Sequence, residues 1–394
     1  MGHLVRLHSG KGLRLSRHLA VLSLFVVTAC GSEHADRAAA ARLHVKNAVA
    51  ALDKNDFVRA LSAASLAVSY DPLDAKARDL LLRVRLTALA TTPQAVRVDD
   101  AADLEYQAET MPVRDAAHAN VYKTARAYFA MARRDTKGAE ALAREAVAAK
   151  GDWAPAHVAL AQALLDGNKP VDASNEFEAA LKADPANTQA LLGEGKLATA
   201  KNEPDKAIPL LEKAAGLRDD AAVHLALGTA YWAKQRAREA GEQLQRATLL
   251  EPKNGDAHLQ LGNFLYLTNQ DEAAQREFQL ANELGQQVQG TFGLAMVLAR
   301  GKQYAQAARL FEAVAGADAT LVGAIYQAGL ARESAGERDA AVQLYRIFAQ
   351  RAAQNPAESQ RVQDANARAE RLAQTPAPKA VAPAAAAPKA AKKP

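Results

Sequence analysis

The sequence has 394 residues, of which 49% are hydrophobic and 5% aromatic, with a formal net charge of +5. The hydrophobic fraction is heavily alanine, which suits closely packed helices better than a sheet enclosing a large core. Residues 1–29 and residues 374–394 each carry four basic side chains and no acidic one, so the stretch between them is net acidic. The basic balance belongs to the two ends and does not indicate a nucleic-acid groove.

Residues 1–29 have the layout of a secretory signal peptide, with a basic start and an apolar run from Leu19 to Val27 that is too short to span a bilayer. The run ends in small residues just before Cys30, the only cysteine in the chain. This pattern resembles a bacterial lipobox, and the resemblance implies that Cys30 is lipidated and that Gly31 after it directs the protein to the outer membrane. The alternative is a plain signal anchor with an incidental cysteine.

After Cys30, residues 30–40 read as a short lipidated tether and residues 41–119 as a partly irregular repeat region. Its first unit, 41–74, carries regularly spaced alanines and ends in Asp71-Pro72. The stretch Ala75–Ala90 is apolar-periodic and predicts a helix that ends before Pro93, and Asp99–Thr110 predicts a second helix. We therefore expect a degenerate or stretched repeat before the regular array.

Residues 120–355 form the regular array, and its pattern is clearest in 221–287. Gly228 and Gly262 occupy the same place in consecutive units, and small residues recur there from Ala127 to Gly329 with a period of about 34 residues. A fixed period of this size marks a helical repeat in which each helix pair must stack on its neighbours to bury its apolar face. At Gly262 two helices must approach closely, with Leu261 and Phe278 filling the space beside it.

The unit that starts at residue 221 resembles the tetratricopeptide repeat. The residues that match the family pattern are Leu227, Gly228, Tyr231, Ala240, Leu244, Ala247 and Pro252. His224 departs from it, because the family usually has a large aromatic residue there. The resemblance implies an all-α fold, an α-solenoid of stacked helix-turn-helix units, and a scaffold that binds proteins or peptides rather than one particular ligand.

The array ends in a polar stretch, 356–373, with the hydrophilic composition of a capping helix. The remaining residues, 374–394, are rich in alanine, proline and lysine and predict a disordered tail. A solvated linker is the favoured interpretation of this tail, and contact with anionic lipid or peptidoglycan is the alternative.

No motif in the sequence predicts an enzyme, a cofactor or a metal site. The pair Gly193 and Gly195 superficially matches a dinucleotide turn, but it lies in a predicted helix and lacks the third glycine. Four histidines, His44, His157, His224 and His258, occupy the fourth position of their repeats, where packing between the two helices is expected. A metal site or pH sensor at His224 and His258 is the alternative.

In this family the first helix of each unit turns its second, fifth, ninth and twelfth positions toward an inner groove. Projecting that register predicts a partner-binding groove lined by Tyr128, Lys196, Trp232, Asn263, Tyr266, Phe292 and Tyr326, with Met131, Leu165, Leu259 and Met296 beside them. Aromatic faces and an asparagine amide suit the capture of a peptide. Leu259 stands where the chaperone-binding members carry a clamp lysine, so a carboxylate-tail ligand is not expected.

The sequence therefore predicts a non-enzymatic scaffold, anchored by lipid in the outer membrane and facing the periplasm, that helps to assemble an envelope machine. Pilus or secretin assembly and exopolysaccharide export are equally compatible with the resemblance. An adaptor or regulatory subunit for peptidoglycan or polysaccharide enzymes is the alternative. A cytoplasmic adaptor with an uncleaved start is a third possibility.

Overall fold

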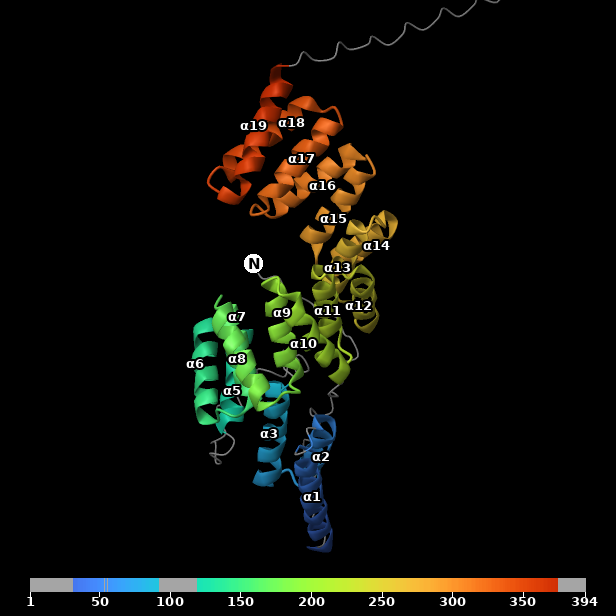
Figure 1. Ribbon diagram of the computed structural model, residues 1–394. Helices are drawn as coiled ribbons and strands as arrows, with labels where there is room; N and C mark the ends of the chain where they lie inside the picture. Colours follow the sequence, from blue (N-terminus) through green and yellow to red (C-terminus); the bar gives the residue numbers. More distant parts are fainter. Residues whose placement is uncertain (1–30, 53, 55, 92–118, 375–394) are drawn as a thin grey trace, which may run out of the picture. The chain divides into compact units, whose positions relative to one another are not determined.

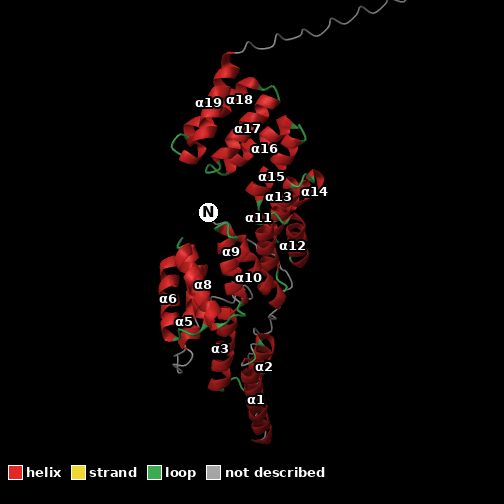
Figure 2. Cartoon of the chain, viewed as in Figure 1, coloured by secondary structure: helices red, strands yellow, loops and turns green. Residues whose placement is uncertain are grey.

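The computed structural model describes residues 31–52, 54, 56–91 and 119–374. These residues contain 18 α-helices and no strand (Figures 1 and 2), which confirms the predicted all-α class. Within the same residues, no helix combines the length and the apolar character that crossing a membrane requires. The predicted signal peptide, Cys30, the predicted helix at Asp99–Thr110 and residues 375–394 lie outside the described part of the chain.

The chain divides into two compact units, Met1–Glu251 and Pro252–Pro394. In the first unit the helices are α1 (Gly31–Leu52), α2 (Phe57–Tyr70), α3 (Ala75–Thr91), α5 (Ala119–Ala132), α6 (Thr136–Ala149), α7 (Ala154–Asp166), α8 (Pro170–Ala183), α9 (Thr188–Ala200), α10 (Pro204–Leu217), α11 (Ala221–Ala233) and α12 (Ala237–Leu250).

In the second unit they are α13 (Gly255–Leu267), α14 (Asp271–Glu283), α15 (Gln287–Arg300), α16 (Tyr304–Ala317), α17 (Val322–Ser334), α18 (Arg338–Ala352), a 3-10 turn (Pro356–Glu358) and α19 (Ser359–Gln374).

From α5 onward the helices pair as first and second helices of successive repeats. The starts of successive first helices are 32 to 35 residues apart, close to the predicted period of about 34. These first helices are α5, α7, α9, α11, α13, α15 and α17. Inside each of the two compact units, every first helix packs on its own second helix, and every second helix packs on the first helix that follows it in the same compact unit. The helix α3 covers the predicted Ala75–Ala90 segment, and it packs on α2 and α5.

Each turn between a first and a second helix places one residue in the left-handed conformation. The φ angle of this residue lies between 56° and 62° at Arg134, Asn168, Asn202, Gln235, Asn269 and Lys302, and it is 78° at Gly336. The next amide then bonds back across the helix end, as the Gln270 N–H does to the Leu265 carbonyl at 2.8 Å. This arrangement satisfies the last carbonyls of the first helix and reverses the chain in a short turn.

The two glycines that set the repeat period lie where helices meet. A Cβ placed on Gly262 would be 2.8 Å from Cδ1 of Phe278, and one placed on Gly228 would be 2.8 Å from Cγ of Leu244. Phe278 and Leu244 are buried. The predicted reason for a small residue at this position, close approach of the first helix to the second, is confirmed.

The last helix, α19, packs on α18 in the way that a first helix packs on the preceding second helix. Ala365 and Ala369 are buried on its inner side, while Val362 and Leu372 pack against the same core cluster. Most of its remaining side chains are polar, in agreement with the polar composition of the stretch predicted to form a cap.

Candidate binding surfaces

In the first unit, two predicted groove residues keep accessible surface. Lys196 on α9 is exposed, and Trp232 on α11 is half-buried. Leu165, at the same repeat position as Trp232 but on α7, is 37% exposed. A cation, an indole ring and an aliphatic side chain on first helices of this unit thus keep accessible surface.

Tyr128 on α5 is the exception in the first unit. Only 7% of its surface is exposed, and it belongs to a core cluster that also holds Leu86 of α3 and Val158 of α7. Its hydroxyl finds no hydrogen-bond partner among the described residues, and burial raises the pKa of the phenol. The expectation that Tyr128 lines an open groove is corrected, because the core around α3, α5 and α7 covers its ring.

In the second unit, Asn263 on α13 is exposed and Tyr266, one turn later, is half-buried. The guanidinium of Arg300, at the end of α15, lies 3.5 Å from the centre of the Tyr266 ring. Arg300 Nη1 also donates to the Tyr266 carbonyl and to Asp271 Oδ1, each at 2.7 Å. These contacts hold the ring in place by a cation–π interaction and fix the arginine at the same time.

Phe292 and Met296 are partly buried on α15 and pack against a core cluster of the second unit. The ring of Phe292 meets that of Phe311 edge-on, with centroids 5.3 Å apart. The predicted residues of α13 and α15 thus supply one exposed amide and partly exposed aromatic and thioether surface. Leu259, also on α13, is partly buried.

Tyr326 on α17 is partly buried and contacts the cap. Its hydroxyl donates to Asp364 Oδ2 on α19 at 2.5 Å, and its ring lies 5.2 Å from that of Phe348. The hydroxyl of Tyr326 and the guanidinium of Arg368 hold the pKa of Asp364 below its usual value. Tyr326 keeps part of its surface, and its role in binding a partner stays a prediction.

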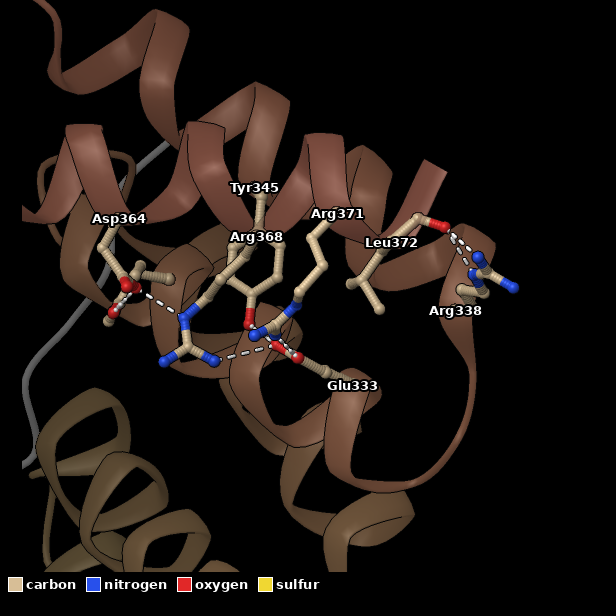
Figure 3. A network of polar contacts seen from close by, with 8 residues as sticks. Glu333, Arg338, Tyr345, Asp364, Arg368, Arg371 and Leu372 are labelled. Carbon is tan, nitrogen blue, oxygen red and sulfur yellow. Dashed lines mark hydrogen bonds and ion pairs between the residues drawn. The ribbon is translucent and has the colours of Figure 1, made fainter. Parts of the chain in front are cut away.

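The contacts around Glu333 explain how α19 is held (Figure 3). The Glu333 carboxylate accepts hydrogen bonds from the Tyr345 hydroxyl at 2.6 Å, from Arg368 at 3.1 Å and from Arg371 at 2.5 Å. Arg338 Nε donates to the carbonyl of Leu372 at 2.6 Å near the end of α19. Polar composition predicted a cap, but it did not identify these partners.

The histidines at the fourth repeat position lie between first and second helices, as predicted. His157 and His258 are buried, and each contacts a glutamate of its own second helix. His224 contacts Gln243 in the equivalent place. His44 instead stacks on Tyr70 of α2, with ring centroids 5.4 Å apart and planes 10° from parallel.

Comparison with known proteins agrees with this architecture. A family model for the tetratricopeptide repeat matches residues 158–222 and 225–287. These two segments are tetratricopeptide repeats. The helix pairs before and after them follow the same period, so the fold is an α-solenoid of tetratricopeptide repeats, and such arrays are interaction scaffolds.

Several solved structures resemble this chain. A chain of the crystal structure of the APC/C hetero-tetramer Cut9–Hcn1 matches with a TM-score of 0.51 and 14% identity, over 82% of this chain and 76% of that one. Yeast Tom70 has a TM-score of 0.45 and 16% identity, with 84% and 82% covered. The pilF structure from Pseudomonas aeruginosa has a TM-score of 0.42 and 17% identity, over 64% of this chain and 98% of that one. With identities this low, the first likeness concerns the fold alone. Comparison with curated protein sequences finds no match.

One tetratricopeptide repeat buries a carboxylate where its neighbours have leucine. Glu194 on α9 is 1% exposed, and it stands at the repeat position of Leu160, Leu227 and Leu261. Its carboxylate accepts hydrogen bonds from Ser174 Oγ at 2.8 Å and from Lys206 Nζ at 2.6 Å. The flanking Gly193 and Gly195 lie inside α9, as expected for repeat residues rather than a dinucleotide-binding loop.

Within residues 31–52, 54, 56–91 and 119–374, no group of three or more histidine, cysteine, aspartate or glutamate side chains could hold a metal ion. His224 and His258 both lie in the tetratricopeptide array, and each is engaged by protein atoms on both ring nitrogens. The absence of an enzymatic activity stays a prediction.

Proposed function

We propose that this protein is a lipid-anchored scaffold of the bacterial cell envelope, which captures a protein or peptide through first-helix side chains of its tetratricopeptide repeats. The array is an interaction scaffold, and the observation that carries the choice of surface is the exposure of Asn263 beside a fixed aromatic ring. Tyr266 is already held by Arg300, so little side-chain entropy is lost when a partner stacks on it.

Each unit offers its own chemistry to a partner. In the first unit the contacts we propose are the cation of Lys196 on α9 and the indole of Trp232 on α11, which suit a segment with an acidic and an apolar side chain. In the second unit the Asn263 amide can donate to and accept from a peptide backbone, while Tyr266 and Phe292 supply apolar area. Aromatic residues in such positions commonly dominate binding energy.

The envelope location rests on the sequence before the first described helix. The residues from Val27 to Cys30 resemble a lipobox, and a lipidated Cys30 would lie next to Gly31, where α1 begins. Two or more acyl chains are needed for stable membrane attachment, and a diacylated, amide-acylated cysteine supplies them. The scaffold then works at the periplasmic side of the outer membrane, in pilus or secretin assembly or in polysaccharide export.

The anchor and the surface are tested separately. Labelled palmitate should enter the membrane-fraction protein and be absent from Cys30→Ala. For the surface, a photo-crosslinking residue at Asn263 should capture a small set of envelope proteins in cells. The matched control is the same residue at Leu280, which is 39% exposed on the second helix of the same repeat.

The partners found at Asn263 would distinguish pilus, polysaccharide and peptidoglycan pathways. Trp232→Ala combined with Tyr266→Ala should weaken pull-down of those partners, and Leu249→Ala should not, since Leu249 is 72% exposed on a second helix. Unchanged pull-down by the double variant, with unchanged helicity, would rule out the first-helix surface.

A further inference from the structure

Three histidines in the array make a repeated set of contacts. His157, His224 and His258 lie on first helices, and Nδ1 of each ring contacts a side chain 19 residues later on the second helix of the same repeat. Nε2 of each ring reaches back to the turn that precedes its first helix. One ring therefore joins three pieces of chain: the first helix, the second helix and the entering turn.

Two of these rings meet only hydrogen-bond acceptors. Nδ1 of His157 lies 2.7 Å from Glu176 Oε2 and Nε2 lies 2.9 Å from the Gly151 carbonyl. In His258 the same atoms lie 2.6 Å from Glu277 Oε2 and 3.1 Å from the Pro252 carbonyl. A carbonyl oxygen cannot donate, and neither can an ionised carboxylate, so both bonds form only if both ring nitrogens carry hydrogen.

We propose that His157 is a charged clamp, a doubly protonated imidazolium ring that holds its helix pair together at neutral pH and releases one of its two bonds as the pH rises. A neutral ring has one N–H and one bare nitrogen. Losing the second proton turns one of the two contacts into a lone pair facing an oxygen. The helix pair then loses a charge-assisted hydrogen bond in a buried place, where such bonds are strongest.

The charges around the His157 clamp favour the second proton. Glu176 reaches His157 from α8, and its hydrogen bond is the main cause that raises the pKa of His157; burial lowers this pKa, and the bond to Gly151 raises it. No other charged group, from α5, α6 or elsewhere in the described residues, is a cause of that shift. Glu277 reaches His258 from α14. In the described ranges no lysine or arginine forms an ion pair with either glutamate, so no cation competes for the carboxylates.

His224 supplies a comparison within the same chain. Its Nδ1 lies 2.6 Å from Oε1 of Gln243, an amide that can present either an oxygen or an NH₂ group to the ring. Its Nε2 lies 2.8 Å from Asp219, whose carboxylate is shared with Arg246. A neutral ring with one proton satisfies both contacts of His224.

The direction of the pH effect follows from linkage. A histidine whose pKa is higher in the folded state stabilises the fold fully below the unfolded pKa of about 6.5, and this contribution is lost as the pH rises through the folded value. The α7–α8 pair, held by His157, is therefore tighter in mild acid than in mild base. A carboxylate with a lowered pKa has the opposite dependence.

The protonation state is read by nitrogen NMR of the full chain with labelled histidine, assigned with His157→Gln, His258→Gln and His224→Gln. At neutral pH the spectra should show both ring nitrogens protonated in His157. A bare ring nitrogen in His157 under these conditions would overturn the proposal.

The mechanical consequence is read by amide hydrogen exchange in α7–α8, compared between about pH 6 and about pH 8.5, on either side of the histidine transition. Protection should fall with rising pH in the wild type, and this loss should disappear in Glu176→Gln. That variant copies the His224–Gln243 pair that the chain already contains, so it is expected to fold, and circular dichroism checks that it does.

The reverse substitution, Gln243→Glu, should transfer the behaviour to α11–α12. Its helix pair should acquire the decline in protection, and the His224 ring should gain a second proton. Constant wild-type protection in α7–α8 across the pH range, or an unchanged decline of protection in Glu176→Gln, would overturn the proposed pH-dependent clamp.

Discussion

Removing the hydroxyl from two buried tyrosines should change the stability of the protein in opposite directions. Tyr128 and Tyr345 are 7% and 0% exposed. The Tyr345 hydroxyl donates to the Glu333 carboxylate at 2.6 Å, whereas the Tyr128 hydroxyl has no partner among the described residues. Replacing each by phenylalanine keeps the ring and the packing, so the change in stability reports on the hydroxyl alone.

The magnitudes follow from burial and bonding. Burying a hydroxyl without a hydrogen bond costs about 1–3 kcal/mol, so Tyr128→Phe should stabilise the first unit by an amount in that range. A hydrogen bond to a charged group contributes about 1.5–3 kcal/mol, so Tyr345→Phe should destabilise the second unit. The loss should lie near the lower end of that range, because Glu333 keeps Arg368 and Arg371.

Urea unfolding of the two variants, with hydrogen exchange to assign each change to its own unit, measures both effects. Exchange is needed because long repeat arrays can depart from two-state unfolding. The reasoning is refuted if Tyr128→Phe destabilises α5 as strongly as Tyr345→Phe destabilises α18. That result would mean that the Tyr128 hydroxyl is bonded in solution, for instance to an ordered water.

Three further predictions concern single positions. Gln235→Gly should raise the free energy of unfolding by about 0.5–1 kcal/mol, because a left-handed conformation is costly for a residue with a Cβ. Asn269→Gly should change the free energy of unfolding less, because asparagine already tolerates this conformation. Thermal unfolding of the two variants compares the effects. Glu194→Leu should be neutral or stabilising in urea unfolding and Glu194→Ala destabilising, because a buried ion pair is often no better than apolar packing of similar volume; a large loss in the leucine variant would contradict this. Acid should weaken the packing of α19, because the pKa of Asp364 is lowered in the folded state. The contribution of Asp364 to stability is complete above its unfolded pKa of about 3.9 and is lost as the pH falls through the folded pKa. Amide hydrogen exchange in α19 should therefore become faster in acid, and this increase should be less steep in Asp364→Asn.

The period of the sequence predicted the fold because it depends on steric demands that recur. Wherever a first helix approaches its second helix closely, as at Gly262 against Phe278, a side chain must be small, and that requirement is visible as a spacing. The left-handed turn residue recurs for the same reason. Asparagine occupies it at 168, 202 and 269, although arginine, glutamine and lysine occupy other turns. Only the glycine and asparagine turns carry a recognisable signal.

The candidate surface was harder to predict than the fold, because the repeat register gives the position of a residue on its helix but not which neighbouring elements cover it. Tyr128 and Asn263 share the ninth position of their first helices, yet one is 7% exposed and the other is exposed. The difference comes from neighbouring elements, because the core that encloses Tyr128 includes residues of α3, a helix outside the regular period. Irregular elements break the repeat, so the repeat cannot predict their contacts.

The polar contacts divide in the same way. The partner of each histidine could have been found, because Glu176, Gln243 and Glu277 all stand at one fixed offset from a fourth-position histidine. At the same offset from His44 the chain has an alanine, and there the ring stacks on Tyr70 instead. Two residue types at fixed positions of one repeat therefore make the same contact in every repeat that carries both of them.

Contacts between different repeats follow another rule. Arg300 stands one full repeat after Tyr266, and its guanidinium lies over the Tyr266 ring and fixes it, while the side chain of Tyr266 stays partly exposed. In the cap, Asp364 and Arg368 similarly take up the hydroxyl of Tyr326 and the carboxylate of Glu333. A complementary group on the following first helix therefore fixes a first-helix side chain, and Asn263, which is exposed beside the fixed ring of Tyr266, is the strongest binding candidate of the second unit.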